Sequence, residues 1–135
     1  TIEATSALGV TATNSIGNLT TFITVEVKNI APKAQLSATD LHVRSGQSFS
    51  MNGSNSFDPN NNVPLTYRWQ QTGGYTVTIN TPNASVTSAT APLVYRSTTL
   101  TFTLTVIDSA GAASVPEVVV VGVSPWQVHL PLLRR

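Results

Sequence analysis

Strict alternation of apolar and hydroxyl-bearing residues is the dominant pattern of the chain. It is clearest in Leu100–Val106, where apolar residues occupy every second position and threonines fill the others. A period of two is typical of a β-strand with one buried and one solvent-exposed face. Similar segments predict strands over Gln47–Asn52, Leu65–Gln71 and Tyr75–Asn80. No window has the i, i+3, i+4, i+7 spacing of an amphipathic helix.

Turn-forming residues separate the predicted strands. Asp, Asn, Pro and Gly, which tolerate turns or positive φ, gather in Asp58–Asn62, Thr72–Gly74, Thr81–Asn83 and Asp108–Gly111. Several short strands bounded by turns indicate an all-β fold. We expect an immunoglobulin-like antiparallel β-sandwich with an extra N-terminal β-hairpin and an extended C-terminal strand.

The chain contains a weak internal repeat. Val10–Asn18 resembles Leu104–Ala112, and a valine-rich strand and a proline follow each copy: Ile23–Val27 in the first and Val118–Val123 in the second. The second copy closes a complete domain, whereas only a few residues precede the first. Residues 1–31 are therefore predicted to form a hairpin that resembles the last two strands of a preceding domain.

An isolated hairpin is marginally stable in water, so this one needs another surface. Three interpretations remain open: the chain is an excerpt of a larger protein, the hairpin extends the sheet of its own domain, or it is donated to a neighbouring copy by β-augmentation. The expected organisation is a hairpin over residues 1–31, a sandwich over 32–124 and an apolar tail over 125–135.

The tail differs in composition from the rest of the chain. Apolar residues alternate at its start, and two arginines end it. Exposure of such a face costs about 25 cal/mol per Å², so we expect the tail to dock. The predicted partner contacts are the alternating apolar residues of hairpin and tail: Ile23, Val25, Val27, Trp126, Val128 and Leu130.

Composition excludes several function classes. Charged residues make up 10% of the chain, the net charge is +1 and no Lys/Arg cluster lies inside it, which argues against nucleic-acid binding. The absence of cysteine excludes disulfides, thiolate nucleophiles and cysteine metal sites. The longest apolar run, around Val118–Val121, is too short to cross a bilayer, and Thr1–Glu3 does not begin a signal peptide.

No residue pattern indicates catalysis. Two histidines, His42 and His129, cannot build a three-histidine metal site, and no nucleophile motif accompanies Asp40 and His42. The carboxylates are scattered along the chain. We therefore expect a protein that is not an enzyme and has no catalytic residues.

Four stretches carry a family resemblance: Asn29–Ala34, Gly53–Pro59, Leu65–Trp69 and Leu104–Gly111. In their order and spacing, residues 32–123 resemble the PKD (polycystic-kidney-disease) repeat, an immunoglobulin-like module of extracellular and bacterial surface proteins. The resemblance implies spacer, adhesion or protein and carbohydrate contact roles outside the cell.

The predicted core anchor is Trp69 on a central strand, with Phe102 and Leu104 facing it, because aromatic side chains bury large areas between sheets. Tyr67 shares the inward parity of Trp69. Trp126, after the last predicted strand, and Tyr95 are the candidates for exposed aromatic contacts.

The resemblance also implies calcium near the Asp-Pro turn, since some relatives bind it there. The candidate ligands are Asp58, Asn60 and Asn62, and one carboxylate with two amides predicts a weak site at best. Alternatively, Asp58 bonds its own turn. No other cofactor is expected. Asn18, Asn52 and Asn83 match the N-glycosylation pattern, which arises easily by chance in a chain this rich in Asn, Ser and Thr.

The leading functional expectation is a non-catalytic extracellular structural or adhesive module of a surface or filament-like assembly. Its partners would be copies of itself or neighbouring immunoglobulin-like domains. The alternatives are a carbohydrate-binding accessory module of a secreted hydrolase, with polysaccharide as partner, and a passive spacer. The tail resembles the Leu-Pro-Leu-hydrophobic-Arg endings of some secreted bacterial surface proteins, so Arg135 is expected to be the natural C-terminus.

Overall fold

The computed structural model describes residues 5–13 and 20–127, with side-chain environments from residue 26 onward. In this part of the chain all regular structure is β, which confirms the all-β prediction. The strands, in chain order, are β1 (Thr5–Thr13), β2 (Thr20–Lys28), β3 (Asp40–Arg44), β4 (Ser48–Asn52), β5 (Thr66–Gly73), β6 (Val86–Thr90), β7 (Thr98–Ile107) and β8 (Glu117–Ser124).

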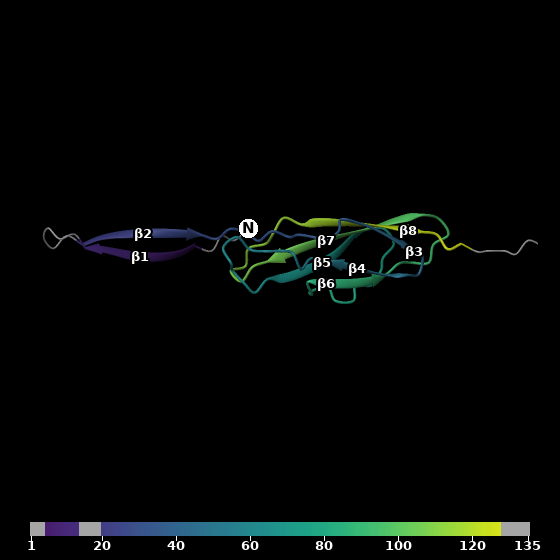
Figure 1. Cartoon of the computed structure of the whole chain (residues 1–135), viewed down its shortest axis with the longest axis horizontal. Coiled ribbons are helices and arrows are strands. Elements are labelled where there is room, and N and C mark those ends of the chain that lie inside the picture. The colour runs from purple at the N-terminus through teal and green to yellow at the C-terminus, as the bar shows by residue number, and fades with distance from the viewer. Residues whose placement is uncertain (1–4, 14–19, 128–135) are drawn as a thin grey trace, which may run out of the picture.

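Strands β3 to β8 form a two-layer sandwich (Figure 1). One sheet has the order β3-β8-β7-β5 and the other consists of β4 and β6. The β5–β7, β7–β8 and β4–β6 pairs are antiparallel, whereas β3 pairs with β8 in parallel. A parallel pair requires a long connection, and the whole remaining domain lies between these two strands in the sequence.

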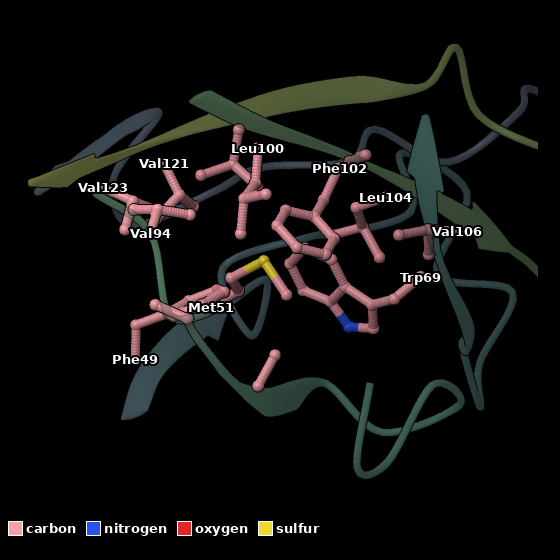
Figure 2. Packing of buried hydrophobic residues seen from close by; sticks show 14 residues of the cluster. Phe49, Met51, Trp69, Val94, Leu100, Phe102, Leu104, Val106, Val121 and Val123 are labelled. Atoms are coloured by element: carbon pink, nitrogen blue, oxygen red, sulfur yellow. The ribbon is translucent and has the colours of Figure 1, made fainter. Parts of the chain in front are cut away.

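The core lies between the two layers. Trp69, Phe102 and Leu104 belong to one buried cluster, and the rings of Phe49 and Phe102 lie 5.7 Å apart at 57° across the two sheets. Figure 2 shows the side chains of β4, β5 and β7 meeting in this space. The threonines that alternate with the buried residues of β7 lie on its opposite side, as the period of two requires.

The strand predicted over Tyr75–Asn80 is wrong. This segment is irregular, and its backbone is bonded outside any strand ladder: Val77 N–H donates to Gln71 Oε1 (2.9 Å) and Asn80 N–H to the carbonyl of Ser88 (2.9 Å). Val77 and Ile79 pack against the core nonetheless. The alternation in the sequence therefore reported which side chains are buried and not how the backbone is paired.

Strands β3 and β6 were not predicted. The sequence of β6, Val-Thr-Ser-Ala-Thr, is mostly polar, and its buried positions are Thr87 and Ala89. A strand that buries small or hydroxyl-bearing residues gives little periodic signal, so only its pairing with β4 identifies it.

The hairpin of β1 and β2 forms a sheet of its own and does not extend either sheet of the sandwich. Its antiparallel register runs from Thr5↔Lys28 to Thr13↔Thr20. In Figure 1 it projects from one end of the sandwich, and the chain leaves β8 at the other end.

The register of this hairpin reproduces that of β7–β8. For the six pairs from Thr5↔Lys28 to Val10↔Ile23, adding 94 to both numbers gives a β7–β8 pair, so that Val10↔Ile23 becomes Leu104↔Glu117. The same operation turns Leu8↔Val25 into Phe102↔Val119. The repeat seen in the sequence is thus also a repeat of backbone pairing.

A tight approach at Gly53 provides a test of the core. A Cβ at Gly53 would overlap Cδ2 of Leu104, which is fully buried, so the packed core around it must shift. We expect Gly53→Ala to lower the free energy of unfolding by about 1–3 kcal/mol, measured by chemical denaturation. The exposed neighbour Ser54→Ala is the control, with a change within about 0.5 kcal/mol. Equal stability of the two variants would contradict the described packing.

Candidate functional site

A polar junction joins the hairpin to the sandwich. The linker residue Asn29 is buried and donates through Nδ2 to Asp108 Oδ2 (2.8 Å), while its Oδ1 accepts from Nδ2 of Asn62. The next residue, Ile30, donates its N–H to Asn60 Oδ1 (2.7 Å). Three hydrogen bonds therefore tie two consecutive linker residues to loops far away in the sequence.

Asp108 is the charged centre of this junction and is 4% exposed. Its Oδ1 accepts the N–H groups of Ala110 (2.9 Å) and Ala112 (2.8 Å), which fixes the turn that follows β7. Burial raises the pKa of Asp108, but the hydrogen bonds from Asn29 and from the turn outweigh burial and hold the pKa below its ordinary value of 3.8. Asp108 is thus a buried carboxylate stabilised in its charged form.

The second loop is organised by Asp58. Its Oδ1 accepts the N–H groups of Asn60 (2.8 Å) and Asn62 (2.9 Å), which is the turn-bonding role considered for this residue. The side-chain amides of Asn60 and Asn62 face the linker, because Asn60 Nδ2 donates to the carbonyl of Lys28 (3.3 Å) and Asn62 bonds Asn29. Among the described side chains, Asp58 Oδ2 is a buried oxygen without a hydrogen-bond partner.

Sequence reasoning placed Asp58, Asn60 and Asn62 near one another but missed Asn29 as their partner. Asn29 and Asp108 are 79 residues apart, so no local spacing connects them. Both residues lie in stretches that carry the family resemblance, which is the only signal in the sequence that selects them.

A second candidate surface lies at the other end of the sandwich. Leu93, Tyr95 and Trp126 are exposed and line, with Val94, a hollow of about 240 Å³. The N–H of Trp126 donates to the carbonyl of Val94 (3.0 Å), which fastens the chain after β8 to this segment.

The predicted partner contacts are described only in part. Ile23 and Val25 pair with Val10 and Leu8 in the hairpin ladder, and Val27 is 48% exposed. Trp126 is exposed, whereas Val128 and Leu130 lie outside the described residues.

Two of the predicted aromatics belong to the interior. Trp69 is buried and donates through Nε1 to the carbonyl of Ala84 (2.9 Å). Tyr67 is half-buried and packs against the core cluster, so neither side chain is available as a contact platform.

Asp40 and His42 lie 3.6 Å apart at an exposed position on β3. In the part of the chain that the structure describes, no group of three or more His, Cys, Asp or Glu side chains is arranged to hold a metal ion. Among the same residues, no helix is long and apolar enough to cross a membrane.

A family model described as K319L-like, PKD domain aligns with residues 37–121. Among solved structures, the chain is similar to the PKD domain from the KIAA 1837 protein, with 27% identity and a TM-score of 0.56. That match covers 73% of this chain and 94% of that domain. No match was found among curated proteins.

Two larger bacterial proteins share the fold at lower identity. A nucleoside hydrolase-related hypothetical protein from Saccharophagus degradans, associated with carbohydrate metabolism, matches with 17% identity and a TM-score of 0.53 over 73% of this chain. The 2,6-sialyltransferase of Photobacterium sp. JT-ISH-224 matches with 16% identity and a TM-score of 0.50 over 64%. The chain spans 26% and 17% of their lengths, respectively, so these matches show the fold alone.

The buried Asn29–Asp108 bond yields a prediction about stability and pH. Asn29→Ala removes one hydrogen bond from a buried carboxylate, and bonds to charged groups contribute about 1.5–3 kcal/mol. We expect that loss in the free energy of unfolding at pH 7, measured by chemical denaturation in EDTA. The exposed Asn55→Ala is the control.

The sign of the pH dependence follows from the lowered pKa of Asp108. The contribution of its carboxylate is fully present above pH 3.8 and is lost as the pH falls through the lower pKa of the folded state. The difference between wild type and Asn29→Ala should therefore shrink below pH 3.8. A difference that stays constant down to pH 2 would contradict a charged Asp108 at the junction.

Proposed function

The chain belongs to the PKD domain family, whose modules are generally non-catalytic and typically occur in extracellular proteins, and we propose that it is an extracellular structural or adhesive module that assembles through its β1–β2 hairpin. The observation that supports this role most strongly is a hairpin that forms a sheet of its own and repeats the backbone pairing of β7–β8.

The contrast is clearest at equivalent positions of the two hairpins. Val27 corresponds to Val121 in the 94-residue repeat, and it is 48% exposed whereas Val121 is fully buried. Val25 corresponds likewise to Val119, which is also fully buried. In the sandwich, the second sheet covers these positions. The β1–β2 hairpin forms a separate sheet, and an isolated two-stranded hairpin is marginally stable in water, so we infer that the face that carries Val27 is covered from outside the sandwich.

The partner that fits is the same hairpin of a second copy. The sandwich already contains β7 and β8, so a donated hairpin would have to displace them to occupy their place. Two hairpins that pack apolar face to apolar face meet no such obstacle and form the self-complementary contact of a two-fold dimer. A neighbouring immunoglobulin-like domain in a longer chain is the alternative cover.

The junction makes the hairpin a directed attachment point. Because Asn29 and Ile30 are bonded to two separate loops, the hairpin leaves the sandwich along a defined path and not through a free linker. A module with a fixed exit direction is suited to an adhesive or filament-like assembly, where successive contacts must have a constant geometry.

Assembly through the hairpin predicts a change of oligomeric state. We expect the full chain to be a dimer or larger by light scattering and Val25→Asp to be a monomer, because a buried charge without a partner is unfavourable. Thr24→Asp, on the other face of the ladder, is the matched control and should stay assembled. Removal of residues 1–27, which retains Asn29, should give the same monomer.

Circular dichroism of each variant verifies that the sandwich is folded. A full chain that is monomeric at every concentration would contradict self-association. The remaining interpretations would then be that a neighbouring domain covers the hairpin or that the chain is a passive spacer. Disassembly by Thr24→Asp to the same degree as by Val25→Asp would contradict the assignment of the apolar face.

Calcium at the Asp58 loop is a separate proposal about the same junction. Asp58 Oδ2 is buried without a partner and is a suitable oxygen for a hard cation, whereas the amides of Asn60 and Asn62 are engaged with the linker. An ion bound there would complete its coordination with backbone or water oxygens. One free carboxylate oxygen supports weak binding only.

We therefore expect CaCl₂ to raise the melting temperature at millimolar and not at micromolar concentration, as in weak extracellular calcium modules. The rise should disappear in Asp58→Asn, with MgCl₂ as the ionic control. A melting temperature that is identical in CaCl₂ and in EDTA would exclude the site.

A further inference from the structure

Three adjoining hollows at the end of the sandwich opposite the hairpin are lined by aromatic side chains. The 240 Å³ hollow shares Trp126 with one of about 460 Å³ beside Arg44 and Gln47. It shares Leu93–Tyr95 with one of about 350 Å³ that reaches Tyr75 and Arg96. The three form a continuous surface, which we call the aromatic groove.

The aromatic side chains of this groove are not part of the core. Tyr95 is 88% exposed, and Tyr75 and Trp126 are each 60% exposed. Single exposed aromatic side chains are ordinary on protein surfaces, whereas three that line connected hollows indicate a contact surface. Flat exposed rings are suited to stacking on other flat, partly apolar faces, such as those of sugar rings.

The backbone that presents the rings is held from below. Val94 is buried in the core cluster, and its N–H donates to Ser45 Oγ (2.8 Å), which itself donates to the carbonyl of Pro92 (3.1 Å). The bond from Trp126 N–H to the carbonyl of Val94 adds the chain after β8. Tyr95 and Trp126 therefore start from fixed backbone positions, which reduces the entropy lost on binding.

The charge of the groove is of one sign. Among the residues that the structure describes, those that line it include Arg44 and Arg96 and no Asp or Glu. Gln47 and Gln127 supply amides that both donate and accept hydrogen bonds. The buried carboxylate of Asp108 is not part of the groove, because it lies in the junction at the hairpin end of the sandwich. The groove thus combines stacking rings, amide groups and two guanidinium groups that match a carboxylate.

We propose that the aromatic groove is a binding site for acidic polysaccharide, with sugar rings stacked on Trp126 and Tyr95 and uronate carboxylates paired with Arg96 and Arg44. This activity is independent of the hairpin assembly proposed above. A single-stranded nucleic acid would also stack, but two arginines on a chain of net charge +1 provide little attraction for a phosphate at every residue.

The two tryptophans of the chain make the test specific. Trp69 is buried in the core and Trp126 is exposed, so acrylamide quenching of the free protein reports Trp126. We expect polygalacturonate to protect Trp126 from acrylamide, and the protection to weaken at 0.5 M NaCl because exposed ion pairs are screened. Dextran, a neutral polysaccharide, should protect far less.

Variants then locate the site by affinity electrophoresis in gels that contain polygalacturonate. We expect Tyr95→Ala and Arg96→Gln each to weaken retardation, Tyr95→Ala by about tenfold in dissociation constant as for a central aromatic anchor. Arg68→Gln is the matched control, because Arg68 is an exposed arginine on β5 outside the groove.

Four results would overturn the proposal. In the quenching experiment, these are a Trp126 that is already shielded from acrylamide in the free chain, protection of Trp126 by dextran equal to that by polygalacturonate, and protection by poly(dT) as strong as that by polygalacturonate. In electrophoresis, the contradicting result is an equal loss of retardation in Arg68→Gln and Arg96→Gln. Shielding of Trp126 in the free chain would show that the protein itself covers the groove. If the shielding increases with protein concentration, a second copy covers the groove; if it does not, the same chain does.

Discussion

The rest of the domain depends on the burial of one face of β7. Leu100, Phe102, Leu104 and Val106 are all fully buried, and they lie at alternate positions of the longest strand. This face packs on β4, through the rings of Phe49 and Phe102, and the edges of β7 pair with β5 and β8. A one-residue slip of register would bring threonines into the core and the four apolar residues into water, so this strand fixes the register of the whole sheet.

The two ends of the sandwich differ in chemistry because different loops meet there. At the hairpin end, Asn29, Asn62 and Asp108 form a buried network in which the carboxylate is satisfied by turn N–H groups and by the linker. At the opposite end, Tyr95 and Trp126 are exposed over a buried Val94. One end thus holds a neighbouring segment of chain by polar bonds, and the other offers stacking surface and positive charge. Both ends can act at once, since neither uses residues of the other.

The 94-residue relation between the two hairpins links sequence, structure and family. The pair in the sandwich that corresponds to Leu8↔Val25 is Phe102↔Val119, and both of these residues are fully buried. The pairing pattern of β7–β8 therefore recurs in β1–β2. The family model aligns with residues 37–121, and β1 (Thr5–Thr13) and β2 (Thr20–Lys28) lie before that range.

The sequence by itself determined the fold class, the strands with strong alternation, the buried set around Trp69, Phe102 and Leu104, and the repeat. These features follow from local periodicity, which the hydrophobic effect converts directly into burial. Strand β6, the irregular path of Tyr75–Asn80 and the parallel β3–β8 pair were decided only by tertiary structure, because backbone pairing between distant segments leaves no periodic trace. The same holds for the junction: the turn role of Asp58 is local and readable, whereas the bond between Asn29 and Asp108 joins residues 79 apart. Only the closed sandwich brings these two side chains together, and there the bond from Asn29 helps to stabilise the buried charge of Asp108.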